Sequence, residues 1–353
     1  MRGARELPGA SPAEHGVPLE HDARIRARAG LISLSVSLLL LAAKFEAYRR
    51  TGSSAVLSDA LESIVNVLAA LFGLGSIAFA GRPADRNHPY GHGKIEFFSA
   101  AFEGGLIAFA ALLIVYEALS ALVLGPELRA LGVGLGIVAA AGAVNALLGV
   151  YLVRTGRRHA SLALEADGKH VLSDSITSAG IVFGLLLVKV TGRVWLDPLL
   201  ACAVALVLFW TGFRLVRQAA GGLLDEEDSV LLGRLVRSLA AHVGREGVIR
   251  LHALRAMRAG RYHHVDAHLV VPEFWSVERA HLVADELAAH VIRELGIEGE
   301  LVFHTDPCHR AYCGQCDLAD CSVRVEPFVG RRPLELEEAV QPDDLERVRG
   351  RAP

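Results

Sequence analysis

The chain has 353 residues, of which 52% are hydrophobic, and its mean hydropathy is +0.37. This apolar content is high for a soluble protein of this length and indicates a membrane protein. The formal net charge of −3 gives no reason to expect a nucleic-acid partner. No GxxxxGK[ST] motif occurs, so we expect no nucleotide partner and no ATP hydrolysis.

The N-terminal 28 residues are polar and contain no apolar core of a signal peptide, so we expect a loosely ordered leader over 1–28. Six apolar stretches follow, each long enough for the roughly 20 residues that a helix needs to cross a bilayer. Backbone polar groups in lipid must be satisfied within the segment, which predicts that these stretches are helices. They are 29–49, 55–80, 97–124, 129–153, 161–190 and 196–217.

Basic residues are concentrated in alternate connections of this arrangement. The leader, the loops after the second and fourth stretches, and the segment after the sixth carry most of them. Cytoplasmic loops of membrane proteins are enriched in Lys and Arg. The pattern therefore predicts that both termini are cytoplasmic.

Two of the apolar stretches carry polar stripes. The second has Asp59, Glu62 and Asn66 at spacings of three and four, which places them on one helical face, and the fifth has His170 and Asp174 four apart. Ionisable groups in a membrane are costly and point to function. Glu62, Asn66, His170 and Asp174 would provide four N/O ligands for one divalent cation, with Asp59 as a substitute for Asn66. The alternative is that the stripes bond to each other or line a water-filled cavity.

The loop after the second stretch reads DRNHPYGHGKIE. Asp85, His88 and His92 have a spacing suited to binding a metal ion. The alternative is a loop folded by Gly91 and Gly93, in which both histidines pack at a dimer interface.

From about residue 218 the sequence changes character, and we expect a small α+β domain over 218–307. Its order is helix, strand, strand, helix, strand, and Ser276 is the expected N-cap of the second helix. The predicted elements are 231–243, 248–260, 261–272, 276–295 and 300–307. Residues 308–353 form a Cys-containing and then acidic tail, which we expect to be poorly ordered after about 325.

The tail contains Cys308, Cys313, Cys316 and Cys321 in a C-x4-C-x2-C-x4-C pattern. Disulfides are disfavoured if this tail is cytoplasmic. Four thiolates so close in sequence suit a tetrahedral zinc site or an iron–sulfur cluster. The competing interpretation is a disordered tail with reactive thiols.

Together, these features resemble the cation diffusion facilitator family of divalent-metal/proton antiporters over about residues 30–310. The resemblance rests on the six spans, the two four-spaced pairs, the HPYGHGKIE loop, the Leu196–Pro198 LDP motif and the FHTDPC ending of the α+β domain. It implies an all-α six-helix transmembrane domain over 29–217 and a cytoplasmic, ferredoxin-like (metallochaperone-like) α+β domain over 218–307. It also implies a homodimer, multi-pass in a bacterial inner membrane, that exports a divalent cation in exchange for protons and is not an enzyme.

By the same resemblance, Glu62, Asn66, His170 and Asp174 form the transport site, and the loop residues bind a second metal. The resemblance also implies a cytoplasmic binuclear site, at which the bound ion acts as a regulator. Its ligands would be His252, His268, His281, His304 and Asp306. The common pattern has Asp or His first and Asp second in the second span, so neutral Asn66 removes one negative charge. Zinc remains the first candidate, and Mn, Fe, Co and Ni become more plausible than they would be at a site with three carboxylates.

Two other classes of function stay open at this point. One is a membrane-anchored metal sensor without transport. The other is an intramembrane metalloenzyme, which needs an open coordination position and a general base. No HExxH motif occurs, which disfavours the enzyme.

Overall fold

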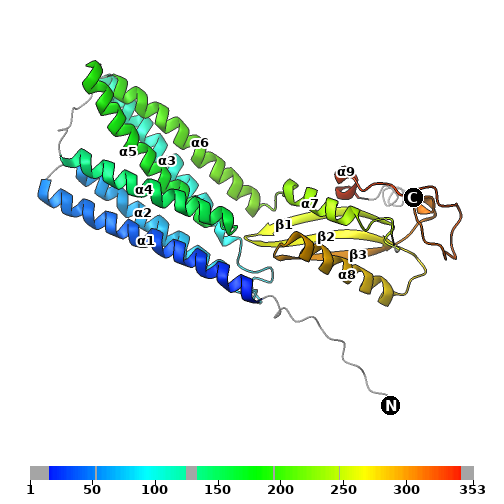
Figure 1. Ribbon diagram of the computed structural model, residues 1–353. Helices are drawn as coiled ribbons and strands as arrows, with labels where there is room; N and C mark the ends of the chain where they lie inside the picture. Colours follow the sequence, from blue (N-terminus) through cyan, green and yellow to red (C-terminus); the bar gives the residue numbers. More distant parts are fainter. Residues whose placement is uncertain (1–15, 52–53, 125–132, 194, 246, 343–353) are drawn as a thin grey trace, which may run out of the picture. The chain divides into compact units, whose positions relative to one another are not determined.

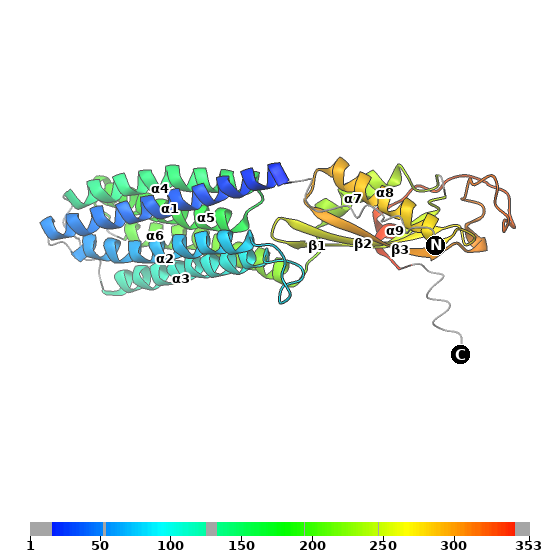
Figure 2. The same ribbon diagram turned by 90° about the horizontal axis from the view of Figure 1, so that it is seen from below.

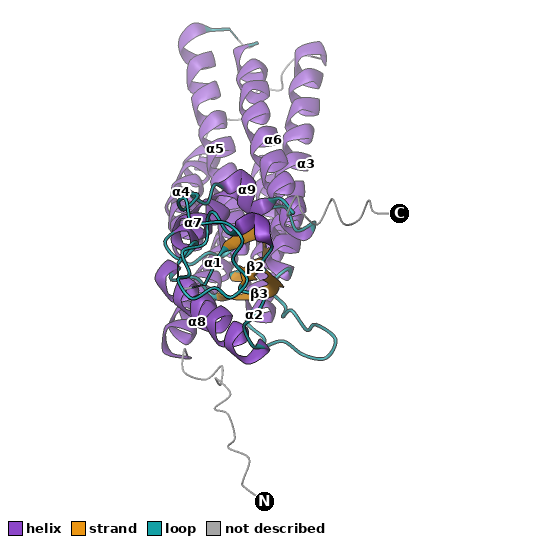
Figure 3. Cartoon of the chain, turned by 90° about the vertical axis from the view of Figure 1, so that its right-hand side faces the viewer, coloured by secondary structure: helices purple, strands orange, loops and turns teal. Residues whose placement is uncertain are grey.

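The computed structural model describes residues 16–51, 54–124, 133–193, 195–245 and 247–342. The chain divides into two compact units, Met1–Ala220 and Gly221–Pro353 (Figure 1). Among the described residues, the first unit contains helices joined by loops, and the strands lie in the second unit (Figure 3). This division agrees with the predicted membrane domain followed by an α+β domain.

In the part of the first unit that the structure describes, six helices lie lengthwise beside one another (Figure 2). They are α1 (Gly16–Thr51), α2 (Ser54–Ala80), α3 (Ile95–Leu124), α4 (Val133–Arg158), α5 (Leu162–Thr191) and α6 (Leu196–Leu223). Within the described residues, α1, α2, α3, α4 and α6 are long and apolar enough to cross a membrane. Helix α5 carries most of its ionisable residues in its first half, and several side chains between 181 and 189 lie outside the described part.

Helix α1 begins at Gly16, so the prediction of a loosely ordered leader is wrong for residues 16–28. Two polar contacts hold this part of the helix to the rest of the unit. Asp22 Oδ1 lies 2.9 Å from His159 Nδ1, and the buried Arg26 pairs with Glu96 at 3.0 Å. The polar sequence therefore extends the helix beyond the apolar stretch instead of forming a separate leader.

Helices α4 and α5 approach closely because glycines face each other at their contact. A Cβ added to Gly168 would lie 2.7 Å from the backbone nitrogen of Val153, and one added to Gly149 would lie 2.9 Å from Gly168 O. Small residues allow such backbone contact between membrane helices. His170 follows Gly168 by two residues, about 200° round the helix at 3.6 residues per turn. The α4 contact thus directs His170 away from α4.

The second unit is a three-stranded sheet with helices on one face. Strand order is β1-β2-β3, with β1 and β2 antiparallel and β2 and β3 parallel. The elements are α7 (Ser229–Ala240), β1 (Arg250–Ala259), β2 (Tyr262–Val271), α8 (Val277–Leu295) and β3 (Gly299–Pro307). The predicted order is confirmed, and Ser276 caps α8 by accepting the Arg279 backbone N–H at 3.2 Å.

Side chains alternate between the two faces of this sheet. Leu251, Leu269 and Leu301 point to the face that α7 and α8 cover and are buried there. His268 pairs with His252 on one side and His304 on the other, so these three project from the opposite face. One face therefore forms the hydrophobic core, and the other carries metal-ligand residue types.

The segment after residue 325 is folded, contrary to the predicted disorder, as far as the structure describes it. Helix α9 (Leu336–Val340) packs Ala339 into the core of the second unit. Glu338 pairs with Arg250, and the Ala253 N–H donates to Gln341 O at 2.9 Å. These contacts hold the segment along β1. Residues 343–353 lie outside the described residues.

Candidate metal sites

The structure brings together three of the four residues of the predicted intramembrane site. Asn66 of α2 lies between His170 and Asp174 of α5: its Nδ2 donates to Asp174 Oδ2, and its Oδ1 is 3.1 Å from His170 Nε2. His170 is buried, and the other two are partly buried. The two polar stripes therefore meet across the α2–α5 contact, as their spacing suggested.

The side chains of Glu62 and Asp59 lie outside the described residues. The backbone of α2 is described at both positions, and Glu62 precedes Asn66 by four residues. Positions four apart share one helical face, so the backbone places Glu62 on the face that carries Asn66. We call Asn66, His170, Asp174 and the position of Glu62 the intramembrane set.

The loop between α2 and α3 gathers Asp85, His88 and His92, which we call the loop cluster. One ligand atom from each lies within 4.8 Å of the others. Asp85 is 3.2 Å from His88 Nδ1 and 3.3 Å from His92 Nε2. Backbone N–H groups of His88 and Asn87 donate to the Asp85 carboxylate and lower its pKa. The carboxylate is thus held ionised beside two imidazoles, an arrangement able to bind a cation.

A second cluster lies on the face of the sheet opposite α7 and α8 and centres on Asp306; we call it the sheet cluster. Asp306 Oδ2 is 2.8 Å from His268 Nδ1 and 3.6 Å from His252 Nε2. Its other oxygen, Oδ1, lies 3.4 Å from His304 Nε2. One carboxylate therefore contacts three imidazoles from three adjacent strands, and its two oxygens face different histidines. This geometry suits a carboxylate that bridges two ions.

His281 does not join the sheet cluster within one chain. It lies on α8, where its Nε2 is 3.3 Å from Asp285 Oδ2, and its side chain is 70% exposed. Helix α8 covers the opposite face of the sheet from the cluster. Sequence position alone could not reveal this separation, because it depends on which face α8 packs against.

The four tail cysteines follow β3 and line one cavity. All four are free thiols, with Cys313 and Cys316 buried and Cys308 and Cys321 partly buried. Burial raises the pKa of the Cys308 thiol, and a hydrogen bond with the Glu273 backbone offsets part of this rise.

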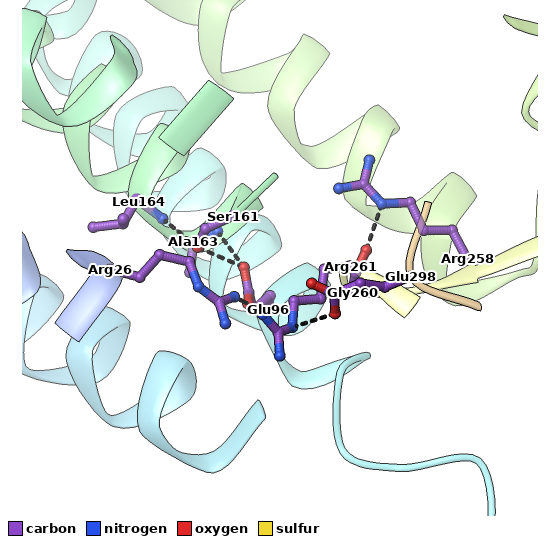
Figure 4. A network of polar contacts seen from close by, with 9 residues as sticks. All are labelled: Arg26, Glu96, Ser161, Ala163, Leu164, Arg258, Gly260, Arg261 and Glu298. Carbon is purple, nitrogen blue, oxygen red and sulfur yellow. Dashed lines mark hydrogen bonds and ion pairs between the residues drawn. The ribbon is translucent and has the colours of Figure 1, made fainter. Parts of the chain in front are cut away.

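One buried network was not recognisable from sequence. The Glu96 carboxylate, 1% exposed, accepts from Arg26 at 3.0 Å and from the Ser161 hydroxyl at 2.6 Å (Figure 4). The Ala163 N–H adds a contact of 3.5 Å. Glu96 therefore links α1, α3 and the start of α5. Arg26 and Glu96 are 70 positions apart, so no local pattern in the sequence indicates this pair.

We expect Asp306→Ala to weaken Zn²⁺ binding at the sheet cluster by at least about 100-fold, since even partners that only orient metal ligands contribute 10–100-fold. Calorimetric titration of the detergent-solubilised chain measures this. Glu286→Ala removes an exposed carboxylate from α8 of the same unit, leaves the contact between Asp285 and His281 in place, and is the matched control. Equal Zn²⁺ binding in both variants would show that Asp306 is not a ligand.

A helical membrane unit with buried metal-ligand side chains, followed by an α+β unit with more of them, defines a metal-transport protein. Comparison with known proteins agrees. Residues 30–224 match the family model described as cation efflux transmembrane domain, and residues 233–308 match that described as cation efflux protein, cytoplasmic domain. The chain belongs to the cation efflux family, also called the cation diffusion facilitators.

Curated relatives cover most of the chain. The uncharacterized transporter sll1263 of Synechocystis sp. is 35% identical over 273 residues, which are 77% of this chain and 88% of that protein. The cation-efflux pump FieF of Shigella flexneri is 28% identical over 295 residues, or 81% of this chain and 94% of the pump. FieF of Cronobacter sakazakii is 28% identical over 294 residues, or 82% and 96%. The chain is therefore a cation efflux transporter and an integral membrane protein.

Proposed function

We propose that the chain is a secondary active transporter that exports a divalent transition-metal cation from the cytoplasm in exchange for protons. The observation that carries this proposal is the Asn66 amide bonded to both His170 and Asp174 across two membrane helices. Polar groups in a membrane interior are costly in free energy, and those that occur there commonly mark a path for ions. The intramembrane set is the proposed transport site.

The hydrogen bonds of this set support proton exchange. Asn66 turns its Nδ2 toward the Asp174 carboxylate, so its Oδ1 faces His170 Nε2. Because an amide oxygen only accepts, His170 Nε2 must carry a proton in this arrangement. A metal ion and a proton therefore compete for Nε2: binding of the metal there releases a proton if the ring is doubly protonated, and moves the proton to Nδ1 if the ring is neutral. On the far side, protons returning to the same groups would release the ion.

The charges of the set bear on which ion is carried. Glu62 and Asp174 would balance a 2+ ion, with neutral His170 and Asn66 completing the ligands. Zinc binds such N/O ligands. Fe, Mn, Co and Ni also bind nitrogen and oxygen ligands, and an amide oxygen suits them better than it suits ions that prefer thiolates. We propose zinc first and these four ions as alternatives.

We also propose that the protein is a homodimer in a bacterial inner membrane with both termini cytoplasmic. The match of the second unit to the cytoplasmic domain of cation efflux proteins and the bacterial relatives support this. The loop cluster and the sheet cluster would then face the compartment from which the ion is taken. His281 would serve at the sheet cluster only if another chain brought it there.

Reconstituted vesicles test the proposed function. Accumulation of Zn²⁺, Mn²⁺, Fe²⁺, Co²⁺, Ni²⁺ and Cd²⁺ is measured in one preparation, with protein-free vesicles as the blank. We expect at least one of these ions to accumulate faster than in the blank. Metal bound by the protein without accumulation of any ion would instead favour a membrane-anchored sensor.

Asn66→Asp is expected to increase the number of protons released when a metal ion binds. The new carboxylate would lie beside Asp174, and two adjacent carboxylates cannot both stay ionised without a cation. Metal binding would then expel the extra proton. Calorimetry in buffers of different ionisation enthalpy counts these protons. Asn66→Gln keeps the amide and should release no more protons than the native chain. Equal numbers of released protons in the native chain and both variants would contradict the assignment of Asn66 to the metal site.

A further inference from the structure

The four tail cysteines lie where β3 ends. The Cys308 N–H donates to Val271 O at 2.8 Å, which continues the pairing of β3 with β2 by one residue. Because side chains alternate along a strand, Cys308 lies on the same face as Asp306, opposite the face that α7 and α8 cover. Cys308 and Cys316 pack there in a small hydrophobic cluster with Ile249, Val270 and Tyr312. The tail thus covers the open face beyond the sheet cluster.

The middle pair of cysteines sits on a tight turn. A short 3-10 helix, Arg310–Tyr312, precedes it, and the N–H groups of Cys313 and Cys316 donate to Arg310 O and Tyr312 O at 3.0 and 3.1 Å. Both side chains are 8% exposed. This C-x2-C turn places both thiols on the wall of the cavity that Cys308 and Cys321 also line. C-x2-C spacing is typical of structural zinc sites.

Arg324 fixes the backbone of the same loop. Its guanidinium donates to four carbonyl oxygens, of Cys313 at 3.0 Å, Cys316 at 2.9 Å, Leu318 at 2.6 Å and Glu326 at 3.4 Å. The loop therefore has a defined path that presents all four cysteines to one cavity. A fixed cation beside the cavity also offsets part of the negative charge that several thiolates would bring together.

From this arrangement, we propose that Cys308, Cys313, Cys316 and Cys321 form a site for one thiophilic divalent cation of the zinc type. Each thiol gives up its proton, and the four thiolates complete a tetrahedral shell. Among these four described residues, no three sulfur atoms lie within 4.8 Å of one another. A tetrahedral Zn–S₄ shell has sulfurs about 3.8 Å apart at Zn–S distances near 2.3 Å. Ion binding therefore draws the thiols together and tightens the tail on the sheet.

This site is separate from those already described. Cys313, Cys316 and Cys321 lie outside both matched regions, 30–224 and 233–308, so membership of the family does not account for them. The proposal also does not rest on the proposed transport function, since the intramembrane set belongs to the other unit.

Cobalt substitution of the purified, reduced full-length chain tests the proposal. We expect one equivalent of Co²⁺ to produce the near-ultraviolet sulfur-to-cobalt charge-transfer band and the visible bands of a tetrahedral thiolate site, and Zn²⁺ to abolish them. The double variant Cys313→Ser/Cys316→Ser should lose these bands. Cys202→Ser, which removes the thiol in α6, and Asp306→Ala should keep them. Absence of the bands in the native chain, or their persistence in the double variant, would overturn the proposal.

Alkylation of the native chain keeps the test independent of whether the serine variants fold. Bound Zn²⁺ should slow the reaction of the four tail cysteines at least about ten-fold, because the reactive thiolates are occupied by the metal, and should leave Cys202 unchanged. No protection by Zn²⁺ would contradict the site. Iron with acid-labile sulfide in the purified chain, or a Cys313–Cys316 disulfide that excludes metal, would equally contradict a single-ion thiolate centre.

Discussion

Asp174→Ala is expected to reduce metal accumulation in reconstituted vesicles to the rate of protein-free vesicles, a loss of at least about 100-fold. Asp174 is the only carboxylate among the described side chains of the intramembrane set, and it accepts a hydrogen bond from Asn66. Without it, a divalent ion would enter the membrane interior with one negative charge fewer around it. Initial rates of metal uptake, normalised to the amount of inserted protein, measure the effect.

Glu117→Ala provides the matched control for this substitution. Glu117 is an exposed carboxylate of α3, and its removal changes the net charge of the same unit equally. Asp174→Asn, which retains the shape and a hydrogen-bonding oxygen, separates the need for charge from the need for a ligand. Native flux in Asp174→Ala would refute the transport site, and equal losses in Asp174→Ala and Glu117→Ala would point to a general effect of charge.

Glu96→Ala is expected to lower the stability of the membrane unit strongly. Both members of its ion pair with Arg26 have side chains only 2% exposed. Breaking a buried ion pair by removing one partner costs about 3–5 kcal/mol, because the remaining charge stays buried. The Ser161 hydroxyl also loses its acceptor. Thermal unfolding of the detergent-solubilised chain should show a clear drop in midpoint.

Glu46→Ala is the comparison for this effect. Glu46 pairs with Arg49 at 3.3 Å on the same helix, but both side chains are substantially exposed, at 45% and 79%. Exposed pairs contribute about 0–1 kcal/mol, so this variant should unfold near the native temperature. Replacing both Arg26 and Glu96 by leucine should cost less than Glu96→Ala, because no buried charge remains. Similar midpoints for Glu96→Ala and Glu46→Ala would contradict the role of the buried pair.

The elements of the second unit could be predicted from local patterns. Alternation in VDAHLVV, the Gly turn before Tyr262 and the Ser276 cap are short-range signals, and each corresponds to an element of the structure. The contact between α2 and α5 could also be anticipated from the sequence, because residues of metal-ligand type occur at helical spacing in both helices. Each of these patterns involves residues only a few positions apart, so it can be recognised in a single sequence.

The contacts that were not predicted join residues far apart in sequence. The ordered start of α1 depends on Arg26 meeting Glu96 and on Asp22 meeting His159. The folded end of the chain depends on Glu338 meeting Arg250. Both segments are polar and lack strong periodicity, so their sequences alone resemble disordered termini. Tertiary partners, not propensity, determine their structure.

The central claim is that the intramembrane set carries a divalent metal ion in exchange for protons. Metal uptake and luminal pH should therefore be recorded together in the same vesicles, for the native chain and for Asp174→Ala. An inward metal gradient is predicted to drive protons out and make the lumen alkaline, and an imposed pH gradient should drive the metal against its own gradient; both effects should vanish in the variant. Metal flux without proton movement, or coupled flux that survives Asp174→Ala, would contradict the claim.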